Sequence, residues 1–94
     1  MRNVSFTSIA FGEYNEWFEI NRPLADRIKL LIRDIDRDPF KGIGKPEPLR
    51  GNWTGYWSRR IDQEHRLIYK VTETQILVVK CKGIIETGFL RQMM

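Results

Sequence analysis

One stripe of apolar residues in the first half of the chain constrains the fold more than any other feature. It consists of Leu24, Ile28, Leu31, Ile32 and Ile35. This spacing places all five side chains on one face of a helix. Because the opposite face is charged, the stripe needs a second layer of structure to cover it. The pattern predicts an amphipathic helix that begins near Pro23 and ends before Asp38-Pro39.

Another helix is predicted just before this one, beginning near Ile9. Aromatic residues recur on one of its faces at three- and four-residue spacing: Phe11, Tyr14, Trp17 and Phe18. Thr7 or Ser8 can cap its first turn, and the Asn-Arg-Pro run at 21–23 breaks it. Ahead of it, Val4–Thr7 is a short β-type run, which we expect to form an edge strand or a lead strand.

The second half of the chain follows a different period. Three runs with strand character span about Tyr56–Ile61, Arg66–Val71 and Gln75–Lys82. The connections at 62–65 and 72–74 are of hairpin length. The sequence therefore predicts an α+β fold in which two N-terminal helices pack on one face of a twisted antiparallel sheet.

Charge is distributed unevenly along the chain, whose net charge is +4. Residues 1–40 contain six basic and seven acidic side chains, whereas residues 41–94 contain ten and five. A basic excess predicts an acidic partner, either nucleic acid or an acidic protein. Strand alternation directs Leu77, Val79 and Cys81 toward the helices, and it places five cations on the other face of the sheet. These are Arg60, Arg66, Lys70, Lys80 and Lys82. Such a face is either a binding surface or simply hydrated.

Between the helices and the strands, residues 40–55 are rich in Gly and Pro and show no period, which predicts a long loop. Within it Glu47 lies between Pro46 and Pro48, so its carboxylate is presented on a stiff, extended backbone. A rigid acid close to arginines suits phosphodiester chemistry on RNA. The simpler alternative is a solvated glutamate in a loop.

Other kinds of chemistry find no support in the sequence. Cys81 is the one cysteine and His65 the one histidine, too few to build a zinc site. Cys81 lies in an apolar run, so we expect a buried core residue. No metal or cofactor is expected. No apolar run approaches the ~18–20 residues of a membrane span, and no secretory signal is visible, so we expect a cytoplasmic protein with no membrane partner.

Several of these motifs occur together in a known family. Two helices are followed by Gly-Lys-Pro-Glu-Pro-Leu (44–49), Gly-Tyr-Trp-Ser-Arg-Arg-Ile (55–61) and Glu-His-Arg-Leu-Ile-Tyr (64–69). In this order the chain resembles the YoeB/Txe toxins of bacterial toxin–antitoxin modules, which belong to the RelE/ParE superfamily. The resemblance covers about residues 4–82 of one expected domain, 1–94, and leaves 83–94 as a divergent tail. It implies a microbial-RNase-like (RelE-like) fold.

The resemblance also implies an activity and partners. Toxins of this family cleave messenger RNA at the ribosomal A site, a metal-independent reaction that inhibits translation. They are neutralised by a YefM/Phd-type antitoxin and are often dimers. The chain is therefore expected to be a ribosome-dependent endoribonuclease that binds the ribosome, mRNA, an antitoxin and a second copy of itself.

Residue by residue, the resemblance assigns roles within this reaction. Glu47 matches the general base that deprotonates the 2′-hydroxyl, and Arg66 matches the residue that stabilises the charged phosphorane. Arg60 matches a second arginine that orients the phosphate. Three further cations are expected to contact the RNA: Lys45, Arg59 and Lys82.

The chain departs from the family pattern near its C-terminus. The family has a His-Tyr pair there, whose histidine protonates the leaving 5′-oxygen, and here Ile84 and Ile85 occupy those positions. Isoleucine cannot donate a proton, so cleavage is expected to be attenuated about 10²–10⁴-fold. His65 is expected to make a structural hydrogen bond instead of replacing the acid. Two alternatives remain open: a catalytically degenerate toxin that binds antitoxin or ribosome without cleaving, and a gyrase-directed toxin.

Overall fold

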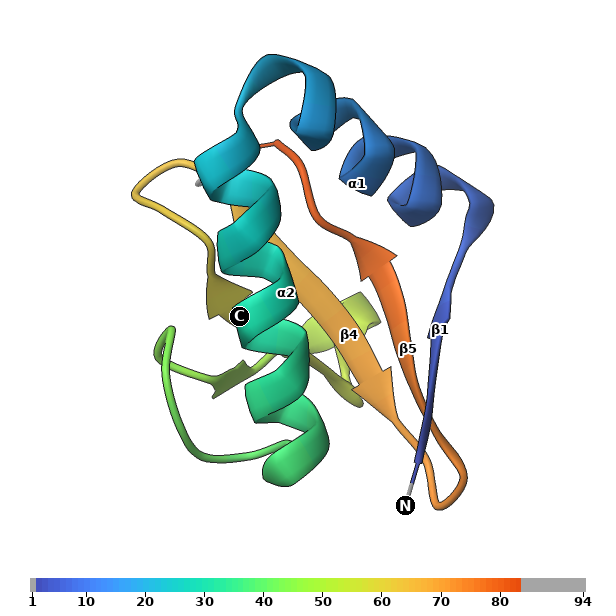
Figure 1. Ribbon diagram of the computed structural model, residues 1–94. Helices are drawn as coiled ribbons and strands as arrows, with labels where there is room; N and C mark the ends of the chain where they lie inside the picture. The colour runs from blue at the N-terminus through green and yellow to red at the C-terminus, as the bar shows by residue number, and fades with distance from the viewer. Residues whose placement is uncertain (1, 84–94) are drawn as a thin grey trace.

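The computed structural model describes residues 2–83 of the 94-residue chain. Two helices, α1 (Ser8–Ile20) and α2 (Arg22–Arg37), lie on one side of a five-stranded sheet (Figure 1). In spatial order the strands are β1 (Asn3–Phe6), β5 (Gln75–Lys80), β4 (Arg66–Val71), β3 (Tyr56–Arg60) and β2 (Glu47–Pro48). The predicted α+β class is confirmed.

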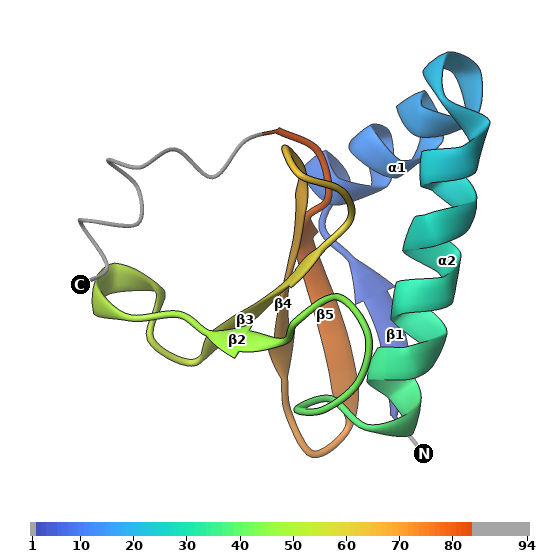
Figure 2. The same ribbon diagram turned by 90° about the vertical axis from the view of Figure 1, so that its left-hand side faces the viewer.

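β3, β4 and β5 are antiparallel, as the sequence predicts, and β2 adds a short antiparallel strand within the stretch predicted to be a loop. The strand β1 differs, because it pairs in parallel with β5, with Asn3 opposite Gln75 and Phe6 opposite Val78. The short N-terminal run therefore forms an edge strand, as expected, and makes the sheet a mixed one. A view with the sheet nearly edge-on places α2 on one side and the 3-10 turn after β2 (η1, Gly51–Trp53) on the other (Figure 2).

Local side-chain contacts explain where the helices begin and end. The hydroxyl of Thr7 accepts a hydrogen bond from the Ala10 N–H at 3.2 Å and caps α1. Asn21 ends α1, and its side-chain oxygen accepts a bond from the Leu24 N–H at 3.4 Å, which caps α2. Pro23 occupies the first turn of α2, where its missing N–H costs nothing. One short polar junction thus turns the chain between the two helices.

The main core forms between the helices and the sheet. From α2, the side chains of Ile28, Leu31 and Ile35 are fully buried, and they meet Leu67 and Tyr69 of β4 in one cluster. Each buried aliphatic side chain contributes roughly 1.5–3 kcal/mol relative to an exposed one. The predicted stripe on α2 therefore holds this helix against the central strands. Cys81 is also fully buried in this core, as expected.

The strand β5 corrects one expectation about orientation. Ile76 and Val78 are the residues buried in the helix-facing core, whereas Val79 packs against the cluster on the opposite side of the sheet. The prediction that Leu77 and Val79 face the helices is therefore wrong. Residues 76–79 are all apolar, so alternation alone does not reveal which side faces the helices. A register shift between β4 and β5 at Ile68/Tyr69 further breaks the simple period.

A second, smaller apolar cluster lies on the other side of the sheet. Leu49 and Ile68 are buried there, and three half-buried side chains pack against them: Trp53, Tyr56 and Val79. This cluster anchors the chain immediately after Glu47 onto the central strands. In the described part of the chain, neither helix has the length and apolar character needed to cross a membrane.

Candidate active site on the open face of the sheet

The face of β3 and β4 that points away from the helices is called the open face here. The register of these two strands arranges its residues in three cross-strand rows. The rows are Tyr56 with Lys70, Ser58 with Ile68, and Arg60 with Arg66. Tyr56 and Ile68 belong to the smaller apolar cluster, while the last row consists of two guanidinium groups. The open face is therefore apolar around Tyr56 and Ile68 and has cations in both end rows.

The loop before β3 brings Glu47 to the middle row. In β2, Glu47 pairs with Ser58 and Pro48 with Trp57, and the Leu49 N–H donates to the Tyr56 carbonyl at 2.8 Å. Because Glu47 lies between two prolines, its backbone is restricted to an extended conformation. Its carboxylate is exposed to solvent. A rigid acid thus stands one row away from the two arginines.

A second contact secures the loop on the far side of Glu47. The Arg60 N–H donates to the Gly44 carbonyl at 2.7 Å. Gly44 has a φ of 80°, and a Cβ atom there would come within 2.9 Å of the Leu31 side chain. Only glycine fits such a position without displacement. The residues before and after Glu47 are therefore both fastened to the sheet.

The electrostatics of Arg66 show that these groups lie close to one another. Burial and the neighbouring charge of Arg60 lower the pKa of Arg66, whereas the carboxylate of Glu47 acts in the opposite direction. Neither Arg60 nor Arg66 makes a side-chain hydrogen bond or ion pair with any residue between 2 and 83. Two like charges on adjacent strands repel each other, so this row favours binding of an external anion.

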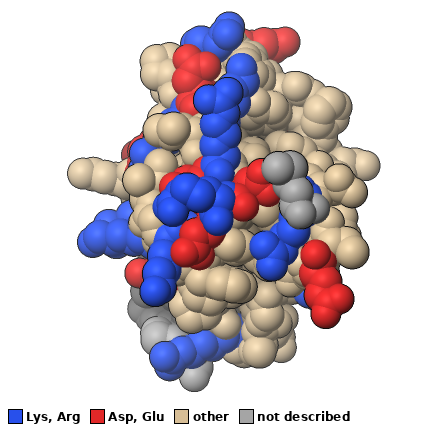
Figure 3. All heavy atoms as spheres, turned by 60° about the horizontal axis from the view of Figure 1, so that its bottom comes forward, with Lys and Arg blue, Asp and Glu red and all other residues tan. Residues whose placement is uncertain are grey.

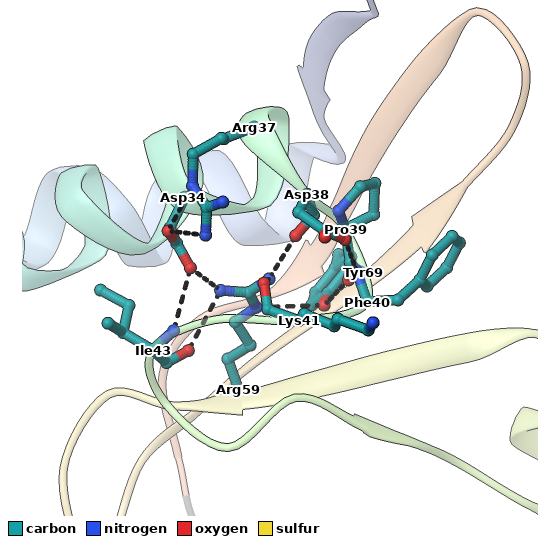
Figure 4. A network of polar contacts seen from close by, with 9 residues as sticks. All are labelled: Asp34, Arg37, Asp38, Pro39, Phe40, Lys41, Ile43, Arg59 and Tyr69. Carbon is teal, nitrogen blue, oxygen red and sulfur yellow. Dashed lines mark hydrogen bonds and ion pairs between the residues drawn. The ribbon is translucent and has the colours of Figure 1, made fainter.

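Arg59 does not fit its expected role as an RNA contact. Its side chain is fully buried on the helix-facing side of β3. The guanidinium donates to the Asp34 carboxylate at 2.5 Å and to the carbonyls of Asp38, Lys41 and Ile43 at 2.7–3.1 Å (Figure 4). Its Nε also donates to the Tyr69 hydroxyl at 3.2 Å. The guanidinium fastens the loop after α2, and RNA cannot reach it.

Burial and the charge of Arg59 shift the pKa values of Asp34 and Tyr69. Burial raises the pKa of the Asp34 carboxyl, but hydrogen bonds from Arg59, Arg37 and the Ile43 N–H outweigh burial and lower it to about 2. Burial also raises the pKa of Tyr69, whose hydroxyl donates to the Pro39 carbonyl at 2.7 Å. The network is therefore a charged carboxylate and a protonated phenol around one buried guanidinium.

Lys80 and Lys82 are not part of the free cationic surface that alternation predicts. Lys80 Nζ pairs with a Glu13 oxygen of α1 at 3.1 Å. Lys82 Nζ pairs with Glu16 of the same helix and lies 5.6 Å from the centre of the Trp17 ring. Both ammonium groups are thus already neutralised within the fold. Basic and acidic side chains are similarly interleaved on the face drawn in Figure 3.

The other expected RNA contact, Lys45, lies in the loop just before Glu47. Its side chain is exposed, and its backbone has a φ of 52°, a left-handed conformation that is uncommon for a lysine. This conformation turns the chain between Gly44 and Pro46. Its position beside Glu47 is compatible with the expected phosphate contact, which stays a prediction.

His65 makes a structural hydrogen bond, as expected. Its Nδ1 accepts from the Gly83 N–H at 2.9 Å, and its ring lies edge-on to Trp17, with 4.8 Å between ring centres. This bond occupies the Nδ1 atom of the ring. Ile84 and Ile85, the positions of the missing general acid, lie outside the described residues.

Sequence reasoning missed some residues that shape the site. Asp34, on the charged face of α2, is the counter-ion of Arg59, and no local pattern signals a pairing across 25 positions. The support that Leu49 and Ile68 give to Glu47 was also missed. Within residues 2–83, no group of three or more His, Cys, Asp or Glu side chains gathers in a way that could hold a metal ion.

Comparisons with known proteins agree with this architecture. Residues 6–83 match the family model described as YoeB-like toxin of bacterial type II toxin-antitoxin system. Toxin YoeB of Streptomyces coelicolor is 53% identical over 79 residues, which cover 84% of this chain and 94% of that protein. Toxin YoeB of Escherichia coli K12 is 45% identical over 73 residues, covering 78% and 87%.

Solved structures give the same result. The YoeB dimer from Staphylococcus aureus superposes with a TM-score of 0.82 at 41% identity, covering 86% of this chain and 94% of that one. A YoeB–YefM complex from the same organism gives 0.81 at 42% identity, with coverage of 87% and 95%. On sequence and fold together, the chain belongs to the YoeB-like toxins of bacterial type II toxin–antitoxin systems.

Proposed function

We propose that this toxin is a metal-independent endoribonuclease that cuts messenger RNA in the ribosomal A site. The observation that carries the proposal is the open face, where a rigid exposed carboxylate lies one row from two arginines. Neither arginine has an acidic partner among residues 2–83. An acid beside unpaired guanidinium groups matches what RNA self-cleavage needs, namely a base for the hydroxyl and cations for the phosphate.

The chemistry assigns one task to each of these groups. The Glu47 carboxylate takes the proton from a 2′-hydroxyl, and the resulting 2′-oxygen forms a bond to the adjacent phosphorus. Arg66 and Arg60 stabilise the extra negative charge on the pentacoordinate phosphorane. The bond from phosphorus to the 5′-oxygen then breaks. The products are a 2′,3′-cyclic phosphate and an RNA fragment that begins with a 5′-hydroxyl.

The leaving 5′-oxygen also needs a proton. Neither Ile84 nor Ile85 can supply it, and His65 is engaged with the Gly83 backbone. We therefore propose that the proton comes from solvent and that cleavage is attenuated by about 10²–10⁴-fold relative to a chain with a positioned acid. Binding to RNA and to the ribosome does not depend on that acid.

The partners follow from the same proposal. The solved complexes of Staphylococcus aureus YoeB with YefM support a YefM-type antitoxin, and the YoeB dimer from that organism supports a homodimer. An enzyme acting in the A site meets its substrate on translating ribosomes. This places the toxin in the cytoplasm with the ribosome and mRNA as partners.

Primer extension on a translated message tests the activity. Purified ribosomes are incubated with the wild-type protein or with Glu47→Gln, which keeps the shape of the side chain and removes the base. We expect A-site cuts with the wild type and about 10²–10⁴-fold fewer with Glu47→Gln. Wild-type protein that co-sediments with ribosomes but makes no cuts would identify a non-cleaving binder instead.

The missing acid is tested separately. Because a positioned acid adds about 10²–10⁴-fold, the double substitution Ile84→His and Ile85→Tyr should increase the cleavage rate strongly. The matched control is Ile84→Gln with Ile85→Phe, which resembles the first pair in size but offers no acid. An equal rate in both double variants would show that the C-terminal positions are not limiting.

A further inference from the structure

The open face carries a third cation whose role the reaction leaves unassigned. Lys70 lies opposite Tyr56 in the first cross-strand row, at the other end from the arginines. Its ammonium group lies over the Tyr56 ring, 5.4 Å from the ring centre, and the lysine is exposed. It makes no ion pair with any residue from 2 to 83. A cation held in place in this way is available to an external anion.

The position of Lys70 is fixed by its neighbours. The Tyr56 ring is held by the smaller apolar cluster and contacts Trp53 edge to face, with 5.2 Å between ring centres. Lys80 and Lys82, which alternation had placed on the same face, are neutralised by Glu13 and Glu16. Lys70 is therefore the sheet cation that remains unpaired beside the arginine row within the described chain.

The spacing of the rows gives this cation a place along an RNA strand. Successive rows are two residues apart, which corresponds to about 7 Å along the strands. Arg60 and Arg66 form one end row, Glu47 extends the middle row, and Lys70 lies in the row beyond it. If the arginines contact the phosphate that is cleaved and Glu47 contacts the 2′-hydroxyl, the next row lies farther toward the RNA 5′ end.

We propose that Lys70 and Tyr56 form a subsite for the phosphate on the 5′ side of the nucleotide that supplies the 2′-hydroxyl. Lys70 binds this phosphate, and the Tyr56 ring holds the ammonium group in position. The subsite rests on the proposed function for its direction along the RNA. It adds a binding contact one nucleotide away from the bond that breaks, so it acts on RNA affinity and register and takes no part in proton transfer.

The experiment measures binding of a 2′-deoxy dinucleotide of adenosine, with and without a 5′-phosphate. This probe lacks the nucleophile, so binding is observed whether or not the protein cleaves RNA. NMR titration of the wild-type full chain is expected to show about three- to tenfold tighter binding when the 5′-phosphate is present. Lys70→Ala is expected to remove this gain, and Lys70→Arg to keep it.

The salt dependence gives an independent readout. In Lys70→Ala, loss of the contact with the 5′-phosphate should make binding of the phosphorylated probe less dependent on salt concentration than in the wild type. Lys29→Ala is the matched control, because Lys29 also lies over an aromatic ring, 4.8 Å from the centre of Phe18, but projects from α2. This control is expected to bind both probes like the wild type.

The two proposals fail in different ways. A gain from the 5′-phosphate that is the same in Lys70→Ala as in the wild type would overturn the subsite, even if primer extension shows cleavage. A gain that depends on Lys70, in a protein that makes no A-site cuts, would support the subsite and overturn only the ribonuclease activity.

Discussion

Arg59 and Arg60 are neighbours on β3 and have opposite environments. Arg59 is fully buried and donates hydrogen bonds to a carboxylate, a hydroxyl and three backbone carbonyls. Arg60 is exposed and lies across from Arg66, another cation. The first arginine is satisfied entirely within the fold, whereas the second gains a partner only when an anion binds. The fold thus uses one residue type for stability on one face and for recognition on the other.

Replacing the buried arginine should give the largest effect. Arg59→Met removes the counter-ion of Asp34 and leaves the carbonyls of the loop after α2 without a donor. We expect a loss of about 3–5 kcal/mol in the free energy of unfolding, measured by urea denaturation. Arg60→Met, the matched control, should change that free energy by no more than about 0.5 kcal/mol. Equal losses in the two variants would contradict the division of roles.

Replacing an arginine of the open face should affect catalysis and spare the fold. Arg66→Ala removes one of the charges proposed to stabilise the phosphorane, so we expect cleavage to fall by about 10²–10³-fold in the primer-extension assay. The free energy of unfolding of Arg66→Ala should not decrease, because Arg66 lies next to another positive charge. A variant that cleaves normally would remove Arg66 from the site.

Acid should weaken the buried network around Arg59. The pKa of Asp34 is about 2 in the folded protein, below its ordinary value of 3.8, so the folded state binds this proton less readily than the unfolded state. The resulting stabilisation, about 2 kcal/mol, is complete above pH ~4 and is lost as the pH falls toward 2. Urea midpoints at several pH values should show this loss in the wild type and a smaller one in Asp34→Asn.

An exposed arginine with an acidic partner provides the smallest expected effect. Arg22 and Asp26 form a solvent-exposed pair at 3.5 Å on α2. Such pairs contribute little because water screens both charges. Asp26→Asn should therefore change the free energy of unfolding by less than about 0.5 kcal/mol in the same denaturation assay. A loss as large as that of Arg59→Met would mean that burial does not distinguish these arginines.

The sequence predicts most of the secondary structure because its signals are local. The stripe on α2, the cap at Thr7, the helix break at residues 21–23 and the short hairpin connections each depend on residues close together in the chain. The conclusions that failed involve distant partners. Nothing near Lys80 or Lys82 reveals that Glu13 and Glu16, on the first helix, will neutralise them.

The residues of the candidate site could be predicted from the sequence to a similar extent. Alternation places Arg60, Arg66 and Lys70 on one face, and the register of β3 and β4 agrees. Arg59 is predicted to contact RNA, and this prediction is wrong because its burial depends on Asp34 and a folded loop as partners, which the strand pattern does not show. The roles of Glu47 and Arg66 came from the family resemblance and stay predictions.

The parallel pairing of β1 with β5 has a consequence for how this toxin folds during its synthesis. β1 precedes the other described strands, yet its partner in the sheet is β5, the last of them, with Asn3 opposite Gln75. Until residues 75–80 have been synthesised, β1 has no neighbour, and closing such a long loop makes the pairing slow. A nascent chain therefore cannot complete this sheet until β5 has left the ribosome.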